Sequence, residues 1–417
     1  MSRTIVGLDI GAYCIRTVIG EIDSDGGFRI SGTSEVPSAG IRSGVIVNIG
    51  EAIQAIKASV GAAEMNSGCT VTSCITGIGG DQIDSQHSNG RVGIPTKGKV
   101  YGQITEEDID RVIESSKSAI APIADKDIIH VLTQDYIVND MRGIKTPLGM
   151  QAYKLEAEVL IVRTSATQIQ NIKTCLAEGE YVLDGVMLKT LAAAQAVTAP
   201  DELESGSVLI DIGYDTTDAV VICENAPVCT VSVPLGGKHV TRDIAGVKGI
   251  SDETAEKLKR EHGWCWEDGI DVVEEVLIPG VGGQAPEQTT NKELCQIIQA
   301  RMEEIFVLVR EEISRRQVVR GAIHGNIVLT GGGAKVRGAE SLAQYVFQTL
   351  NVRIGAPLSL GGITEDYCKP EFATAVGLVL MGKMAMPVAA QTRGRKSPVR
   401  PAEDRPGFLK KLKDALF

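Results

Sequence analysis

Apolar and polar positions alternate in two similar segments about half a chain apart. Residues 5–11 read IVGLDIG and residues 208–213 read VLIDIG, and a second apolar run follows each of them, RTVIGEI and AVVICEN. This pattern predicts a strand, a tight turn and a second strand in both places. A single Asp-x-Gly is typical of a simple β-turn. Two copies instead indicate a duplicated core with a cleft between its halves.

Two further segments place glycines after predicted strands. Residues 327–338 read IVLTGGGAKVRG, and residues 233–244 read VPLGGKHVTRDI, with Gly236 and Gly237 ahead of a predicted helix. Glycine lets the backbone approach a ligand closely and exposes N–H groups to phosphate, although any one run is also an ordinary loop. Four glycine-bearing strand ends favour one shared site in the cleft.

Asp9 and Asp211 end the two matching strands. An ionised carboxylate at the end of a buried strand costs free energy unless a cation or a hydrogen-bond donor faces it. Two carboxylates that face each other across a cleft can hold the water shell of Mg²⁺ bound to ATP. The pattern therefore predicts that Asp9 and Asp211 contact Mg²⁺ through water.

An insert at residues 83–162 separates the two halves of the core. It contains ITEEDIDRVIESSKSAI, in which Thr105 can cap a helix. The apolar positions of that helix fall on one face, at Ile109, Val112, Ile113 and Ile120. Strand-like runs flank it, DIIHVLTQDYIV and YKLEAEVLIV. The insert is predicted to be a small α/β subdomain.

The last residues change in character. Residues 387–407 are rich in Pro, Arg, Gly and Ser, which predicts a flexible linker. The end, GFLKKLKDALF, would form a basic amphipathic helix suited to an anionic membrane surface. The residues assigned to this membrane helix are Phe408, Leu409, Lys410, Lys411, Leu412, Lys413, Leu416 and Phe417. A helix that folds back on the protein body is the alternative.

Composition narrows the class of protein. The chain has 417 residues, enough for two to four domains, and its apolar share of 43% is that of a globular protein. A net charge of -11 argues against a nucleic-acid partner. Nine Cys without a CxxC pair indicate a reducing cytosol. We find no signal-peptide core or membrane-spanning run, so we expect a cytoplasmic protein.

In their order, these segments resemble the actin-like ATPase superfamily and, within it, the FtsA family of bacterial cell-division proteins. GLDIG is similar to the first phosphate loop of the superfamily, DIGYDTTD to the second, and VLTGGGAKVRG to the glycine loop that closes over the nucleotide. The narrower match rests on GIKTPLGMQAYKLEAEV, VTRDIAGVKGISDETAEKLKREHG, IIQARMEEIFVLV and the tethered tail.

The resemblance implies a duplicated two-domain α/β fold, actin-like and related to ribonuclease H, with an inserted small α/β subdomain and a C-terminal amphipathic helix. Its subdomains would be 1A at 1–82, 163–190 and 364–386, 1C at 83–162, 2A at 191–243 and 325–363, and 2B at 244–324, followed by the linker at 387–407 and the membrane helix at 408–417.

The resemblance also implies ATP and Mg²⁺ as cofactors. Asp9, Asp211, Thr216 and Thr217 would face the phosphates and metal, Arg16 would add positive charge, and the glycine run would lie against the α-phosphate and sugar. Glu256 and Lys259 would lie on the ribose and adenine side, and a solvated helix face is the alternative for this pair. The full set is Asp9, Gly11, Ala12, Arg16, Asp211, Gly213, Thr216, Thr217, Gly236, Gly237, Glu256, Lys259, Gly331, Gly332 and Gly333.

Several residues depart from the family pattern. Tyr214 and Asp215 replace two glycines of the usual DIGGGTTD, and Tyr13 stands where small hydroxyl residues are common. Lys189 and Thr190 replace a frequent Glu-Pro pair near the point where hydrolysing relatives orient the attacking water, a role that an ammonium cannot fill. We therefore expect ATP binding with weak or absent hydrolysis.

The implied function is that of a filament-forming protein that tethers FtsZ to the cytoplasmic face of the cell membrane at the division site. Arg301 and Glu304, in IIQARMEEIF, match family positions that contact the C-terminal peptide of FtsZ, and a routine surface pair is the alternative. Self-association and later division proteins bound through the insert are the other implied partners. The competing class is an enzyme of the same fold, a small-molecule kinase or a chaperone-type ATPase.

Overall fold

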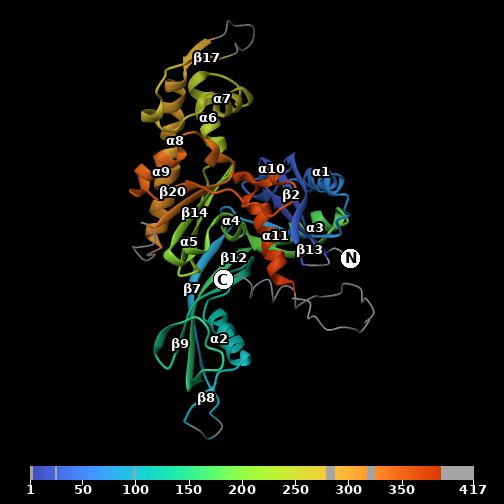
Figure 1. Cartoon of the computed structure of the whole chain (residues 1–417), viewed down its shortest axis with the longest axis vertical. Coiled ribbons are helices and arrows are strands. Elements are labelled where there is room, and N and C mark those ends of the chain that lie inside the picture. The colour runs from blue at the N-terminus through green and yellow to red at the C-terminus, as the bar shows by residue number, and fades with distance from the viewer. Residues whose placement is uncertain are drawn as a thin grey trace.

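The computed structural model describes residues 3–23, 26–96, 98, 100–278, 287–316 and 325–386. Two sheets lie side by side at mid-height of Figure 1, a helical arm rises above them, and a smaller unit with α2, β8 and β9 extends below. The predicted linker at 387–407 and membrane helix at 408–417 lie outside the described residues. In the described part of the chain, no helix has the length and apolar character needed to cross a bilayer.

The first sheet has five strands in the order β13-β6-β1-β2-β3. These are β1 (Arg3–Ile10), β2 (Cys14–Ile22), β3 (Phe28–Pro37), β6 (Ser73–Ile78) and β13 (Val182–Leu188). β1 runs antiparallel to β2 and parallel to β6, and Asp9 pairs with Arg16 at the hairpin end. The helices of this half are α1 (Ile49–Ser67), α3 (Ala166–Glu178) and α11 (Ala373–Ala385).

The second sheet repeats the first. Its order is β16-β15-β14-β19-β20, built from β14 (Ser207–Ile212), β15 (Thr217–Cys223), β16 (Ala226–Val233), β19 (Asn326–Thr330) and β20 (Val352–Ile354). The strand directions match as well, because β14 is antiparallel to β15 and parallel to β19. The duplication predicted from the two Asp-Ile-Gly segments is therefore confirmed.

Two helices pack between the sheets, α4 (Lys189–Val197) and α11. Their backbones touch, since a Cβ placed on Gly377 of α11 would lie 1.7 Å from the carbonyl oxygen of Ala192 in α4. The hydrophobic core around them includes Leu209 and Val220 of the second sheet as well as the strands of the first. The two halves consequently share one core along these helices.

The insert forms a four-stranded sheet of order β10-β9-β12-β7 with one helix. Its elements are β7 (Asp84–Gly93), β8 (Gly102–Gln103), α2 (Glu106–Ser118), β9 (Lys126–Val138), β10 (Met141–Ile144), β11 (Gln151–Ala152) and β12 (Lys154–Ser165). Thr105 caps α2 in a reciprocal capping box with Asp108, and Ile109, Val112 and Ile113 pack into the insert's own core. The helix predicted here is confirmed.

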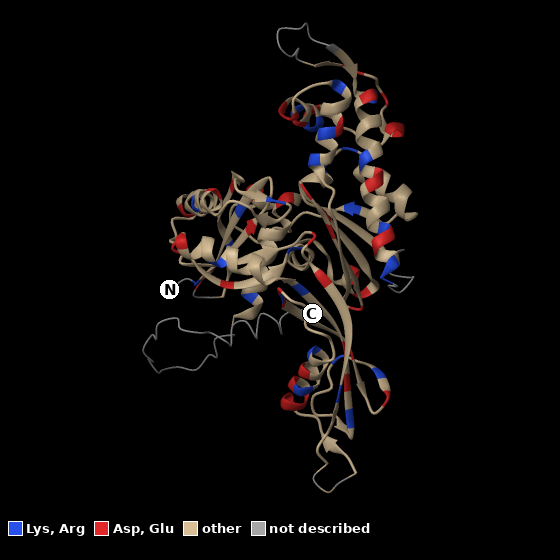
Figure 2. Cartoon of the chain, turned by 180° about the vertical axis from the view of Figure 1, so that it is seen from behind, with Lys and Arg blue, Asp and Glu red and all other residues tan. Residues whose placement is uncertain are grey.

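The helical arm at the top of Figure 1 consists of α6 (Gly237–Lys248), α7 (Asp252–His262), α8 (Asn291–Arg315) and a hairpin of β17 (Glu275–Ile278) and β18 (Glu287–Thr290). Figure 2 shows charges of both signs interspersed on this arm. Two ion pairs, Lys248 with Glu293 and Arg301 with Asp243, join α6 to α8. The remaining elements are β4 (Ile41–Arg42), β5 (Val45–Ile46), α5 (Pro200–Ser205), α9 (Ala339–Phe347), α10 (Thr364–Tyr367) and the single-turn helices Glu267–Gly269, Gly332–Lys335 and Pro370–Phe372.

Candidate functional site

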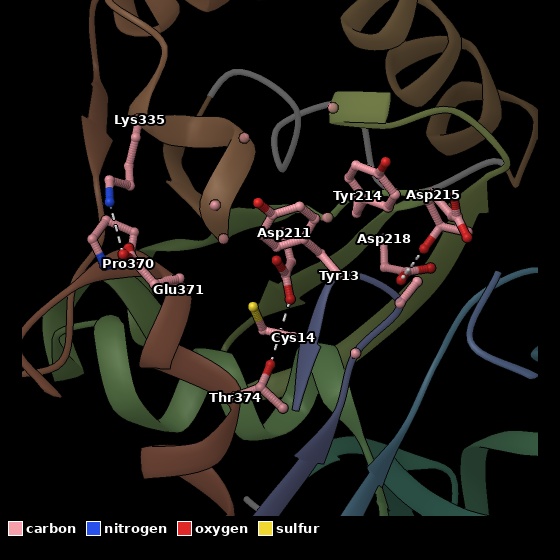
Figure 3. A pocket seen from close by; sticks show the side chains of 18 of the residues that line it. Tyr13, Cys14, Asp211, Tyr214, Asp215, Asp218, Lys335, Pro370, Glu371 and Thr374 are labelled. Atoms are coloured by element: carbon pink, nitrogen blue, oxygen red, sulfur yellow. Dashed lines mark hydrogen bonds and ion pairs between the residues drawn. The ribbon is translucent and has the colours of Figure 1, made fainter. Parts of the chain in front are cut away.

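A cavity of about 410 Å³ lies between the two halves. The turn after β1 and the turn after β14 both line it, together with the glycine loop after β19 and residues of α6 and α7. Figure 3 shows part of this lining, including Asp211 with Thr374 and Lys335 with Glu371. The structure therefore brings the duplicated Asp-Ile-Gly turns to one site, as the sequence predicted.

Of the residues proposed for the nucleotide, all but Thr217 and Gly236 line the cavity. The Thr217 side chain is buried in β15, where its hydroxyl donates to the carbonyl of Leu235 at 2.8 Å. Gly236 lies against the second turn, since a Cβ there would come within 2.7 Å of the Gly213 and Tyr214 carbonyl oxygens. These two residues support the loop and do not face the cavity.

The glycine loop after β19 makes very close backbone contacts. A Cβ on Gly331, which has a φ of +82°, would lie 2.2 Å from Asp211 Oδ1, and a Cβ on Gly333 would lie 2.3 Å from Ile212 Cγ2. In the first turn, a Cβ on Gly11 would meet the Cys14 carbonyl oxygen at 2.5 Å. Side chains are therefore excluded here, and bare backbone borders the cavity on both sides.

Three carboxylates lie at the centre of the lining, on Asp9, Asp211 and Asp218. Burial raises the pKa of Asp211 to about 7, and the nearby charges of Asp218 and Asp9 raise it further, against the lowering effect of Lys189. Thr374 donates a hydrogen bond of 3.4 Å to Asp211 Oδ2. Asp211 is therefore partly protonated near neutral pH.

Asp218 was missed in the sequence, although it is the last residue of DIGYDTTD. Its carboxylate accepts from the Gly80 N–H at 3.2 Å and from the Thr216 hydroxyl at 3.1 Å, and burial raises its pKa. Gly79 and Gly80 also line the cavity. The signal that could have found them is the segment TGIGG at 76–80, a further strand end with glycines.

Asp215 departs from the family pattern without placing a free negative charge in the cavity. Its Oδ2 accepts from the Ser43 N–H at 2.7 Å, and its Oδ1 pairs with the Lys238 ammonium at 2.9 Å. Ser43 belongs to the first half of the molecule, so this buried carboxylate links the two halves.

Tyr13 and Tyr214, the two tyrosines of the turns, contact each other across the cavity. Their ring centroids are 5.0 Å apart, and the Arg260 guanidinium lies 4.9 Å from the centroid of Tyr13. The rings thus narrow the space between the two turns.

Glu256 and Lys259 on α7 form a buried network and do not belong to a solvated helix face. The Lys259 ammonium contacts Glu256 Oε2 at 2.6 Å and donates to the Gly237 carbonyl at 2.9 Å and to the Thr241 hydroxyl at 2.8 Å. Burial lowers the pKa of Lys259. The side chains of Val240, Met302 and Val336 form an apolar wall on the same side of the cavity.

Arg16 lines the cavity and pairs with Glu35, at 3.2 Å between Nε and Oε2. Arg301, proposed for partner binding, lies on α8 and outside the cavity lining. Its guanidinium makes a two-pronged contact with the Asp243 carboxylate, at 2.6 and 3.1 Å, and a further ion pair with Glu304. An acidic peptide would therefore have to share or replace these contacts.

Comparison with known proteins identifies the chain. The family model described as "Cell division protein FtsA" matches residues 208–377, and that described as "SHS2 domain inserted in FTSA" matches residues 80–163. Cell division protein FtsA of Borreliella burgdorferi is 38% identical over 382 residues, 91% of each chain. The chain belongs to the FtsA family. The FtsA of Pseudomonas aeruginosa is 34% identical and covers 97% of this chain and 96% of its own. A role in cell division follows from this membership.

Solved structures with the same fold include the PilM-PilN type IV pilus biogenesis complex and MreB5 of Spiroplasma citri bound to ADP. The first has a TM-score of 0.62 at 17% identity and covers 90% of this chain and 97% of its own. The second has a TM-score of 0.55 at 15% identity, with coverages of 91% and 96%. The FtsA-family chain therefore has the actin-like fold that the sequence predicted.

The two implied cofactors differ in how well they fit this FtsA-family site. The close glycine backbones, the apolar wall and the cavity volume suit a nucleotide. The surroundings of Asp9 do not suit Mg²⁺, because the Lys189 ammonium already lies 2.7 Å from Asp9 Oδ1. Among the described residues, no group of three or more His, Cys, Asp or Glu side chains could hold a metal ion directly. Water-mediated Mg²⁺ at Asp9 and Asp211 stays a prediction of the sequence.

Proposed function

We propose that the cavity binds ATP and that the chain uses ATP as a structural ligand in an actin-like filament. One observation above all supports this: the two matching Asp-bearing turns and the close-packed glycine loop border one cavity of about 410 Å³. Cavities of roughly 300–1,000 Å³ are typical of small-molecule sites.

In this proposal, the backbones at Gly11, Ala12, Gly213 and Thr216 face the phosphates, with Arg16 nearby. The loop at 331–333 borders the α-phosphate and sugar. The base lies beside the apolar wall of α6 and α8, where Glu256 and Lys259 offer polar contacts. A base stacked in an apolar enclosure and phosphates on bare backbone N–H groups make the usual division of labour in such sites.

Hydrolysis is proposed to be weak or absent. An attacking water needs a carboxylate or amide to orient it, and the residue beside the first turn is Lys189, whose ammonium donates to the Ile10 carbonyl. An enzyme of the same fold, acting on a small molecule or a protein client, is the alternative function.

ATP binding and phosphate release, measured in the same sample at saturating nucleotide, test this part of the proposal. Tight binding with release slower than about one turnover per hour is the expected result. Steady turnover would support the enzyme alternative, and failure to bind ATP, ADP or both in any buffer would overturn the proposal. Sedimentation of the protein with and without ATP checks filament formation.

We further propose that the chain tethers FtsZ to the cytoplasmic face of the cell membrane at the division site. Family membership supports this role, and the basic amphipathic sequence at 408–417 supports a peripheral attachment to anionic lipid. Later division proteins would bind the insert. Arg301 and Glu304 on α8 would receive the acidic C-terminal peptide of FtsZ.

Replacing Arg301 tests the peptide site. The Arg301 side chain is 25% exposed and lies between Asp243 and Glu304, so Arg301→Glu would set three carboxylates together and repel an acidic peptide. We expect the affinity for the FtsZ peptide, measured by fluorescence anisotropy, to fall at least tenfold. Arg315→Glu, at the exposed end of the same helix, is the charge-matched control. Equal affinities for the two variants would contradict the assignment.

A further inference from the structure

The Lys189 ammonium occupies the central position among the acidic groups of the cavity. Lys189 is the first residue of α4, and its Nζ lies 2.7 Å from Asp9 Oδ1 and donates to the carbonyl oxygen of Ile10 at 2.7 Å. The Lys189 side chain is 15% exposed and that of Asp9 is 10% exposed. A lysine held this way is a fixed part of the site and not a surface charge.

Glycines on the neighbouring strand create the path for this side chain. A Cβ on Gly77, in β6, would lie 2.9 Å from Lys189 Cγ, and a Cβ on Gly79 would lie 3.4 Å from Lys189 Cδ. The lysine stem therefore lies flat against bare backbone. A larger residue at position 77 would push the ammonium away from Asp9.

The other two carboxylates of the cavity are within the electrostatic reach of the same ammonium. Lys189 stabilises the charged forms of both Asp211 and Asp218. Their described hydrogen-bond donors are neutral: Thr374 for Asp211, and the Gly80 N–H and the Thr216 hydroxyl for Asp218. One ammonium thus supplies positive charge to an acidic cluster that otherwise relies on neutral donors.

We propose that Lys189 is the built-in cation of this site, standing where a divalent ion would contact Asp9, so that the cavity binds a nucleoside di- or triphosphate without Mg²⁺. This inference rests on the proposed nucleotide site. An ammonium has three donors, and two of them reach Asp9 and Ile10, which leaves the third for a phosphate oxygen. A divalent ion at Asp9 would have to displace the ammonium against direct charge repulsion.

The first experiment uses the metal alone. Mn²⁺ is titrated into nucleotide-free protein, and free Mn²⁺ is followed by electron paramagnetic resonance. Wild type is expected to show no stoichiometric site, whereas Lys189→Gln gains one, and adding Asp9→Asn to that variant removes it. Lys173→Gln, which removes the same charge from an exposed position of α3, should behave as wild type. A stoichiometric Mn²⁺ site in the wild-type protein would overturn the inference.

The second experiment uses ADP and ATP, each titrated in excess EDTA and in excess Mg²⁺. The wild-type affinity should agree within about twofold between the two buffers, whereas Lys189→Gln should bind at least tenfold more weakly in EDTA. A wild-type affinity that collapses in EDTA would refute the built-in cation. Absence of nucleotide binding in both buffers would refute the proposed function, and the Mn²⁺ titration would then decide the role of Lys189. The wild-type comparisons need no variant to fold.

Discussion

At the scale of single residues, the cavity brings acidic groups together at a cost in stability. Asp211 is fully enclosed and faces Asp9 and Asp218, with Lys189 and Arg16 as the nearby cations. A carboxyl group whose pKa is raised on folding binds a proton that the unfolded chain releases. Its contribution therefore favours folding at low pH and is lost as the pH rises.

The pH dependence of unfolding should reveal this group. The ordinary pKa of 3.8 rises to about 7 in Asp211, so this group should lower the free energy of unfolding as the pH increases from about 4 to about 7. The interval corresponds to roughly 4 kcal/mol at about 1.4 kcal/mol per pH unit. Asp211→Asn should remove that slope. Urea unfolding of both proteins at pH 5.5 and 8 measures it, and identical pH slopes would contradict the raised pKa.

Asp215 illustrates the opposite case, a buried carboxylate that is fully partnered. It is 6% exposed and links Ser43 of the first half to Lys238 of the second. Removing one partner of a buried pair leaves the other charge uncompensated. We expect Asp215→Ala to reduce the free energy of unfolding by about 3 kcal/mol.

Thermal unfolding of Asp215→Ala measures that loss, with Glu224→Ala as the control. Glu224 forms an exposed pair with Lys145, and exposed pairs contribute at most about 1 kcal/mol. If the two variants unfold at the same temperature, the link through Asp215 does not stabilise the folded molecule.

At the scale of elements, the sequence predicted the local features well. The hairpins around Asp9 and Asp211 and the capped helix at Thr105 follow from residue patterns over fewer than twenty positions. The contacts of Lys189 with Ile10 and of Ser43 with Asp215 join residues 179 and 172 positions apart. Local patterns carry no information about such pairs, so the sequence predicted a free charge at Asp215 where the structure has an ion pair. The same holds for Glu256 and Lys259, whose burial depends on α6.

The crossing of α4 and α11 gives a test at this scale. Gly377 of α11 touches the Ala192 carbonyl of α4, so the added methyl group of Gly377→Ala cannot be accommodated without separating the helices. Overpacking of this kind costs about 1–3 kcal/mol or more. Gly246→Ala on α6, where a Cβ meets nothing within 4 Å, is the matched control and should stabilise by about 0.5–1 kcal/mol. Denaturant unfolding compares the two, and equal effects would contradict the close crossing.

At the scale of the whole molecule, the two halves are connected at the cavity in three ways. The helices α4 and α11 share one core between the sheets. Asp215 joins the halves by a hydrogen bond, and Tyr13 and Tyr214 touch across the space between the turns. A ligand that enters between the turns must therefore fit against contacts from both halves. This arrangement explains how nucleotide could adjust the relative position of the subdomains in a filament.

Attachment to the membrane is the last property argued at this scale. The sequence at 408–417 places apolar side chains on one helical face and lysines on the other, which suits the interface of an anionic bilayer. Leu412→Glu puts a charge in the centre of the apolar face, so we expect this variant to lose at least tenfold in co-sedimentation with vesicles that contain anionic lipid. Asp414→Glu keeps the charge and pattern and serves as the control. Undiminished co-sedimentation of Leu412→Glu would place the membrane contact elsewhere in the chain, whereas loss of binding with ATP affinity unchanged would assign the tail to the membrane and the cavity to the nucleotide as separate functions of one molecule.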